Sequence, residues 1–255
     1  MIIDCHVHLH QIAVIPGDPG GVQVRFADRV GIDLMCLSLG TSRAGVLDDS
    51  IRGPEIMVRH NDEVHEAWER YPDRFVPFCF LNPNYLPQSL EEIDRRVADG
   101  PFGGIKTIID MFCDHPNLDP IAERAAELGV PVLQHTWSKT TGNYPNESEP
   151  WRLAALARRH PDTTFLAAHT GGNWELGIKT LAPEPNVIAD ICGGDPEVGY
   201  VEMALREMGV ERVVYGSDAP GRSFASQLAK VLGAHISDEH RAQILGGNME
   251  RVLGL

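Results

Sequence analysis

The chain has 255 residues, of which 43% are hydrophobic, and it carries a formal net charge of −14 at pH 7. This acidic balance argues against nucleic acid or an anionic membrane surface as the main partner. The net charge does not exclude a small anionic substrate, because one Lys or Arg in a cleft can still bind an anion. No apolar run approaches the roughly 20 residues that a membrane helix needs, and no signal-peptide pattern is present. We therefore expect a cytoplasmic protein.

The first predicted strand, IIDCHVHL at residues 2–9, carries two histidines two positions apart. Successive side chains of a strand point to opposite faces, so His6 and His8 share one face with Asp4. Cys5 and Val7 are expected on the other face. Two imidazoles that project together make half of a metal site, if other strands supply the rest.

Seven further apolar runs predict strands, and segments with helical period separate them. The runs lie at residues 32–40, 75–83, 103–110, 130–136, 163–172, 186–194 and 212–220. The clearest helical segments lie at residues 61–75, 118–130, 150–162, 195–210 and 237–255. We expect Asn61 or Asp62 to cap the first of these helices, and Gly129 to end the second.

The alternation of strands and helices predicts an α/β fold. The strands are almost continuously apolar, which is typical of a parallel sheet buried on both faces. Eight is the number of strands that closes a (β/α)8 TIM barrel, and a chain of this length suits one such domain over residues 1–255. A doubly wound open sheet is the alternative, disfavoured because no G-x-G-x-x-G follows the first strand.

The five cysteines are spread along the chain without a C-x-x-C pair. Four of them lie inside apolar runs, which is typical of buried, reduced thiols and not of a disulfide framework. They are Cys5, Cys36, Cys79 and Cys192.

Ionisable residues stand at the ends of several predicted strands, which in a barrel line the mouth of the active site. They are His6 and His8 on the first strand, His135 on the fifth, His169 on the sixth and Asp218 on the eighth, with Lys106 on the fourth. A lone histidine is most often a hydrogen-bonded core residue. Several ionisable groups at one level need another explanation, because unpaired buried polar groups are costly.

Imidazole and carboxylate donors without a thiolate suit one divalent transition metal, Zn²⁺ first, with Mn²⁺, Fe²⁺ and Co²⁺ also open. A site at a barrel mouth is expected to keep an open coordination position for water or substrate. A bound metal can lower the pKa of its water to about 7, and a nearby carboxylate or imidazole can then move protons.

These motifs together resemble the amidohydrolase superfamily, in the amidohydrolase-related branch that includes aminocarboxymuconate-semialdehyde decarboxylase, γ-resorcylate decarboxylase and pyrone-dicarboxylate lactonase. The resemblance extends to the segments ERYPDRFVPFCFLNP, HTGGNW and ILGGNMERVLGL. It implies a single metal held by His6, His8, His135 and Asp218. It also implies that His169 lies beside the ligands and transfers protons, and it suggests a homodimer or a higher oligomer.

A two-metal site is the alternative that the wider superfamily implies. The strand-six histidine, His169, would then be a ligand itself, and a carboxylated lysine on strand four would bridge the ions. Lys106 stands on that strand. Otherwise we expect Lys106 to anchor a substrate carboxylate or to pair with an acid.

The substrate is expected to be a small molecule with a carboxylate, and its contacts to come from loops after the strands. Trp137, two residues past His135, and Arg222, just after GSDAPG, are the first candidates beside Lys106. Further candidates on these loops are Arg25, Arg52 and Tyr144.

Two chemistries fit these residues. The first is hydrolysis of a small ester, lactone or amide, in which metal-activated water attacks the carbonyl and His169 and Asp218 move protons. The alternative is a non-oxidative decarboxylase, a carboxy-lyase for a small aromatic or muconate-like acid. We expect hydrolysis, the commoner chemistry of the superfamily. A non-catalytic barrel with a structural metal is disfavoured by the position of the ligands at strand ends.

Overall fold

In the computed structural model, which describes residues 1–9, 17–40 and 53–255, eight parallel strands follow one another in chain order. They are β1 (Ile3–His8), β2 (Leu34–Ser38), β3 (Phe75–Phe80), β4 (Gly104–Thr107), β5 (Val132–His135), β6 (Phe165–Ala168), β7 (Val187–Asp190) and β8 (Val213–Val214). A parallel bridge between Val7 and Ala219 joins the segment after β8 to β1. The backbone N–H of Cys5 also donates to Tyr215 O over 3.0 Å. The predicted (β/α)8 barrel is confirmed.

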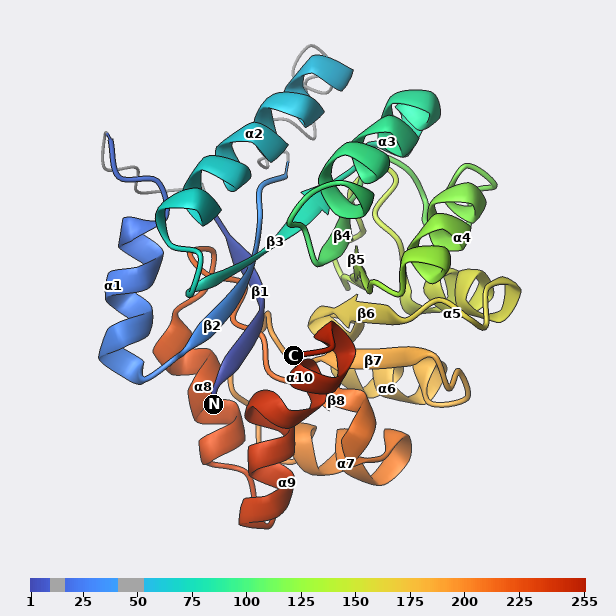
Figure 1. Cartoon of the computed structure of the whole chain (residues 1–255). Coiled ribbons are helices and arrows are strands. Elements are labelled where there is room, and N and C mark those ends of the chain that lie inside the picture. Colours follow the sequence, from blue (N-terminus) through green and yellow to red (C-terminus); the bar gives the residue numbers. More distant parts are fainter. Residues whose placement is uncertain (10–16, 41–52) are drawn as a thin grey trace.

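Helices surround the strands, as Figure 1 shows in a view along the barrel. They are α1 (Gly21–Val30), α2 (Pro54–Arg70), α3 (Leu86–Ile93), α4 (Leu118–Leu128), α5 (Pro150–Arg159), α6 (Trp174–Leu181), α7 (Tyr200–Met208), α8 (Phe224–Leu232), α9 (Asp238–Ala242) and α10 (Asn248–Leu253). None of the helices in the described part of the chain is long and apolar enough to cross a membrane.

Of the predicted helix boundaries, the end of α4 at Gly129 is correct and the start of α2 is wrong. Gly129 ends α4 in the left-handed conformation, with φ 67°, as its lack of a side chain allows. The expected cap at Asn61 or Asp62 is wrong, because α2 already begins at Pro54. Asn61 is buried in the middle of that helix, where its amide donates to Phe80 O and accepts from Phe80 N. Its polar side chain ties α2 to β3.

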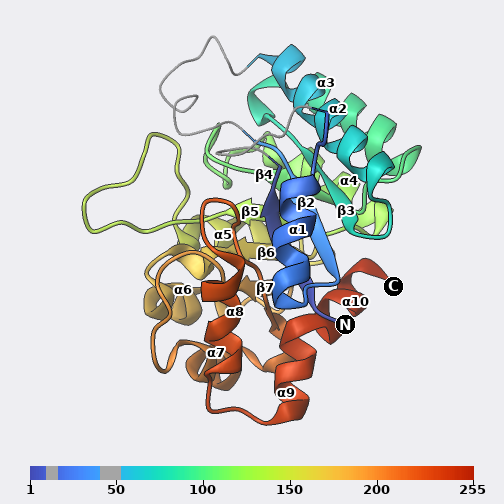
Figure 2. The same cartoon turned by 90° about the vertical axis from the view of Figure 1, so that its left-hand side faces the viewer.

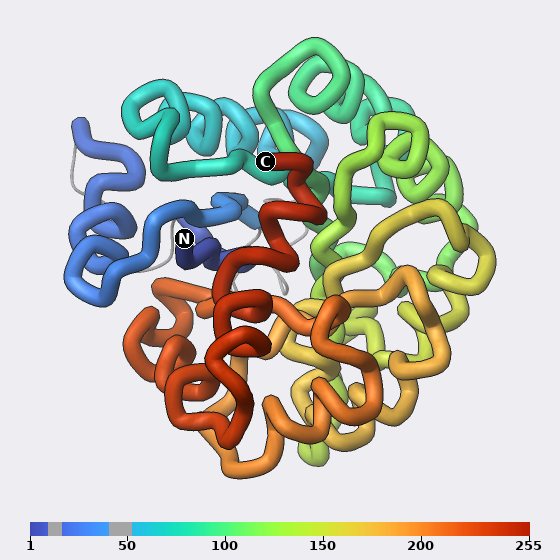
Figure 3. The backbone as a smooth tube through the Cα atoms, turned by 60° about the horizontal axis from the view of Figure 1, so that its bottom comes forward, coloured from blue at the N-terminus to red at the C-terminus, as the bar shows by residue number. Residues whose placement is uncertain are grey.

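The barrel interior and the layer between strands and helices form two separate apolar clusters. The interior holds alternate strand residues such as Phe78, Leu133 and Leu166, with Met249 of α10. Figure 3 shows the C-terminal segment crossing one end of the ring, so that α10 covers this end. In Figure 2 both chain termini lie toward that end, and the loop after β5 projects at the opposite one.

The first strand departs from strict alternation. Its register against β2 shifts between Asp4 and Val7. Cys5 consequently packs in the barrel interior while Val7 packs in the outer cluster, so the expectation that they share a face is wrong. Asp4 does not join the histidines either: its carboxylate accepts from the backbone N–H groups of His6 and Ser217, which ties β1 to the segment after β8.

All five cysteines are buried with free thiols, as predicted for those in apolar runs. Four of them lie in strands or just after a strand, and their side chains pack in the wall of the barrel. Cys192, just after β7, differs from the others because its thiol touches the ionisable residues described next.

Candidate active site

Three of the four predicted metal ligands converge at the ends of β1 and β8. Nε2 of His6 lies 3.1 Å from Nε2 of His8. The carboxylate oxygen Oδ1 of Asp218 lies 3.4 Å from the His8 nitrogen and 3.8 Å from that of His6. His6 is fully buried, whereas the Asp218 side chain is 19% exposed. The three ligand atoms therefore face one small space that opens toward the mouth.

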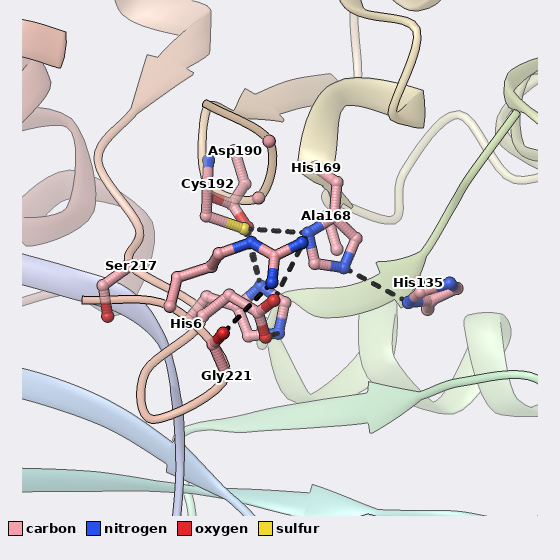
Figure 4. Close-up of polar contacts among 12 residues, drawn as sticks. His6, His135, Ala168, His169, Asp190, Cys192, Ser217 and Gly221 are labelled. Atoms are coloured by element: carbon pink, nitrogen blue, oxygen red, sulfur yellow. Dashed lines mark hydrogen bonds and ion pairs between the residues drawn. The ribbon is translucent and has the colours of Figure 1, made fainter. Parts of the chain in front are cut away.

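His135, the fourth predicted ligand, lies next to His169 instead. Nδ1 of His135 is 3.2 Å from Nε2 of His169, and the two rings meet edge to face. Among the described residues, His135 belongs to no group of three donors whose ligand atoms lie within 4.8 Å of one another. One histidine thus separates it from the three converging ligands, as Figure 4 shows for His6, His169 and His135.

Glu147, which sequence reasoning missed, holds the other nitrogen of His135. Its Oε1 lies 3.0 Å from His135 Nε2, and it also accepts from Lys139 Nζ over 2.7 Å. Burial disfavours the charged carboxylate, but the bonds from His135 and Lys139 outweigh it and lower the pKa of Glu147 to about 2. The glutamate stands in the loop between β5 and α5, where no periodic pattern marks it.

Asp190 and Cys192, also missed, connect the two halves of the site from β7. Oδ2 of Asp190 lies 2.8 Å from His6 Nδ1, and the Cys192 thiol donates to the same oxygen over 2.9 Å. The sulfur lies 3.2 Å from Nδ1 of His169 (Figure 4). A signal for Asp190 was present, since it interrupts the predicted apolar run at residues 186–194, as His169 interrupts the run before it.

Lys106 lies inside the barrel, beneath the converging ligands. Its Nζ is 2.9 Å from Nε2 of His6, and its side chain is almost fully buried. Burial lowers the pKa of Lys106 to about 8, against the opposing effect of Asp218. The lysine is therefore still largely protonated at pH 7, and its positive charge faces the ligands.

Burial and charge set the protonation of the remaining groups. Burial holds the pKa values of His6 and His169 well below the usual range. Burial disfavours ionisation of Asp218, but His169, His8 and His6 outweigh it and hold its pKa well below normal. His169 and Asp218 also adopt the left-handed backbone region, with φ 63° and 59°. Such strain in residues other than glycine is concentrated at functional sites.

The predicted substrate contacts fall in different places. The Trp137 ring lies against the histidines, with its centroid 4.7 Å from that of His169 and nearly parallel to His135 at 6.3 Å. Arg222 is exposed, and its guanidinium donates to the neighbouring Gly221 O.

The weaker candidates lie further from the ligands or outside the described residues. Arg25 pairs with Asp18 at 3.3 Å through an exposed side chain. The Tyr144 ring contacts Lys139 Nζ at 3.8 Å from its centroid, within the loop after β5. Arg52 lies outside the described residues.

A family model described as amidohydrolase matches residues 3–255. Among curated relatives, the γ-resorcylate decarboxylase of Polaromonas sp. (strain JS666) is 22% identical over 282 residues, covering 91% of this chain and 86% of the relative. That of Rhizobium radiobacter is 25% identical over 187 residues, covering 67% and 54%.

Solved structures share the fold over nearly the whole chain. 2,6-Dihydroxybenzoate decarboxylase with 2,6-dihydroxybenzoate has a TM-score of 0.82 at 19% identity, covering 99% of this chain and 98% of that one. The dihydroxybenzoic acid decarboxylase of Polaromonas sp. JS666, with manganese and 2-nitroresorcinol, has a TM-score of 0.80 at 18% identity, covering 100% of this chain and 97% of that one. The manganese complex of 5-carboxyvanillate decarboxylase from Novosphingobium aromaticivorans has a TM-score of 0.70 at 20% identity, covering 92% of this chain and 80% of that one.

These relatives correct the expected chemistry. All the proteins just named are decarboxylases, so the expectation of a hydrolase is wrong and its alternative, the carboxy-lyase, is favoured. The family expected from the motifs is confirmed, since its model covers residues 3–255. The chain belongs to the amidohydrolase family and is an enzyme of it.

Proposed function

We propose that the enzyme catalyses the metal-dependent, non-oxidative decarboxylation of a small hydroxyaryl carboxylate. The observation that carries the proposal is the convergence of His6, His8 and Asp218 beside His169 at the barrel mouth. The decarboxylase relatives supply the reaction class.

The donor set fits one divalent metal. The site offers two imidazole nitrogens 3.1 Å apart and one ionised carboxylate. Divalent transition metals bind to such a mixture of nitrogen and oxygen ligands, and the fully buried His6 gives the site one fixed ligand. His6, His8 and Asp218 would hold the ion, and the family pattern adds His135 as the fourth donor through Nδ1, which in this structure lies beside His169 and not beside the other three ligand atoms. Manganese replaces zinc as the first metal to test, because two of the solved relatives contain it. When bound, the metal supplies positive charge that orients and polarises the substrate.

The residues around these ligands then bind the acid and move one proton. We assign the contact with a planar ring to Trp137, which lines a pocket beside His169. The charge of Lys106, next to His6, favours a carboxylate near the ligands, and the exposed Arg222 is the candidate for a contact at the mouth. The carboxyl group leaves as CO₂, and its ring carbon receives one proton. We assign the transfer of that proton from solvent to the ring carbon to His169 and Asp218, since Oδ2 of Asp218 lies 4.0 Å from Nδ1 of His169.

A substrate panel tests the proposal. Protein loaded with Mn²⁺ is incubated with hydroxybenzoates and with lactones, and released CO₂ and acid are measured separately. We expect CO₂ from at least one hydroxybenzoate, abolished by a chelator and restored by the metal. Acid production from a lactone without CO₂ from any member of the panel would contradict the proposal.

A further inference from the structure

The two ring nitrogens of His6 meet partners of opposite hydrogen-bonding character. On one side, Lys106 Nζ lies 2.9 Å from Nε2, and an ammonium group can only donate. On the other side, the Asp190 carboxylate lies 2.8 Å from Nδ1, and a carboxylate can only accept. His6 must therefore carry its proton on Nδ1, which leaves Nε2, the nitrogen 2.9 Å from Lys106 Nζ and 3.1 Å from His8 Nε2, with its lone pair.

We propose that Asp190 is a positioning residue that holds His6 in this tautomer and so presents Nε2 to the metal. The inference rests on the metal-dependent function proposed above and assigns Asp190 a role within it. A carboxylate behind a histidine ligand fixes the orientation of the ring and raises its basicity. Without that acceptor, the ring gains the freedom to place its proton on Nε2, where a proton excludes a metal.

The carboxylate of Asp190 is itself held in place by its neighbours. Cys192 donates to it twice, from its backbone N–H to Oδ1 over 3.0 Å and from its thiol to Oδ2 over 2.9 Å. The backbone of Asp190 is linked to the turn after β6, because Thr170 Oγ1 donates to its carbonyl over 2.8 Å. A fully buried acid with fixed partners is suited to orient a ring, and it lies too deep to meet substrate.

The segment that carries Cys192 is fastened from outside the barrel. Lys230 of α8 is buried, and its Nζ donates to Ile191 O over 2.9 Å. The backbone of Gly193 lies against the His169 ring. Its φ is 71°, and a Cβ placed on it would lie 2.6 Å from His169 Nδ1. The glycine lets the segment pass close enough for the Cys192 sulfur to reach His6 and His169 together.

A different role for Cys192 would conflict with this inference. Its sulfur and one nitrogen each of His6 and His169 lie within 4.8 Å of one another, a group that could itself hold a metal. In that arrangement Nδ1 of His6 would be a ligand and could not donate to Asp190. The two roles are therefore exclusive and spectroscopically distinct.

The test uses the full-length protein and the nearly isosteric variant Asp190→Asn. In metal-free wild type, ¹⁵N NMR of the imidazole rings should report the Nδ1–H tautomer for His6. Asp190→Asn should weaken Mn²⁺ binding about 10- to 100-fold, the range for removing such a partner, and shift the tautomer signal. Cys36→Ala, which removes a buried thiol elsewhere in the barrel interior, is the control and should leave both unchanged.

Three results would overturn the inference. The first is an Nε2–H tautomer in wild type, which needs no variant to fold. The second is unchanged Mn²⁺ affinity in folded Asp190→Asn. The third is a sulfur-to-cobalt charge-transfer band in the Co²⁺ protein that disappears in Cys192→Ser. A wild-type protein that binds no divalent metal would instead refute the proposed function, and the tautomer measurement would still be decisive for Asp190.

Discussion

His135 Nε2 donates to the carboxylate of Glu147 over 3.0 Å, which leaves Nδ1 as the nitrogen that faces His169. The loop after β5 thereby decides which atom of His135 is directed to the site. A metal ligand at this position would have to bind through Nδ1. The carboxylate behind the ring has the same relation to His135 that Asp190 has to His6.

Replacing Glu147 by Gln should lower stability in a pH-dependent way. The folded pKa of about 2 lies below the ordinary 4.5, so the carboxylate stabilises the fold above pH 4.5 and loses this effect as the pH falls toward 2. At about 1.4 kcal/mol per pKa unit, the loss at pH 7 is at most roughly 3 kcal/mol, less after solvent screening through the exposed side of its partner Lys139. Urea unfolding at pH 7 and in acid measures it.

The control for this prediction is Glu127→Gln, whose carboxylate pairs with Arg124 on the exposed face of α4. Exposed pairs contribute little, so this variant should unfold close to wild type at both pH values. A Glu147→Gln variant whose deficit is equal in neutral and acidic solution would show that its carboxylate charge is not the cause.

The double variant His6→Ala with His8→Ala should lose most of the bound divalent metal. Both nitrogens face the space next to Asp218, and their removal leaves a lone carboxylate there. Elemental analysis of purified protein gives the stoichiometry, expected near one ion per wild-type chain. His65→Ala, on α2 and paired with Glu69, is the control and should retain its metal. Stoichiometric metal in the double variant would refute the assignment.

The fold and most of the site were predictable because their signals are local. Each strand is an apolar run, and a parallel barrel brings the carboxyl ends of all strands to one mouth, so His6, His8, His169 and Asp218 could be placed together from chain order. Trp137 followed the same logic from its place just after β5.

The missed residues lack such a local signal or had one that pointed elsewhere. Glu147 reaches His135 through a loop whose course depends on side-chain contacts such as that with Lys139. Cys192 looked like another apolar-run thiol, and only its distance to His6 distinguishes it. The burial of Cys5 in the barrel interior depends on a register shift in β1 that no sequence pattern predicts.

Replacing Lys106 by Met should stabilise the metal-free protein at pH 7. The folded pKa of about 8 lies below the ordinary 10.5, so burying the ammonium costs most below pH 8, and wild-type stability rises as the pH goes from 8 toward 10.5. The gain at pH 7 is at most about 3 kcal/mol, reduced by the lost contact with His6. Urea unfolding should show the two proteins converging toward pH 10. A gap that widens there would contradict the burial cost.

Replacing His169 by Ala should separate proton transfer from metal binding. Its ring lies between His135 and Cys192, and its Nδ1 is 4.0 Å from Asp218, so it can exchange a proton with that carboxylate. General acid–base groups typically contribute about 10²- to 10⁴-fold to rate, and turnover should fall within that range while metal content stays near wild type. His135→Ala should lower both, because Nδ1 of His135 is the expected fourth donor. Elemental analysis and CO₂ release, measured on the two variants side by side, decide the assignment. If His169→Ala halves the bound metal, His169 is a ligand, Lys106 becomes the candidate bridge of a two-metal site, and the single-metal assignment is wrong.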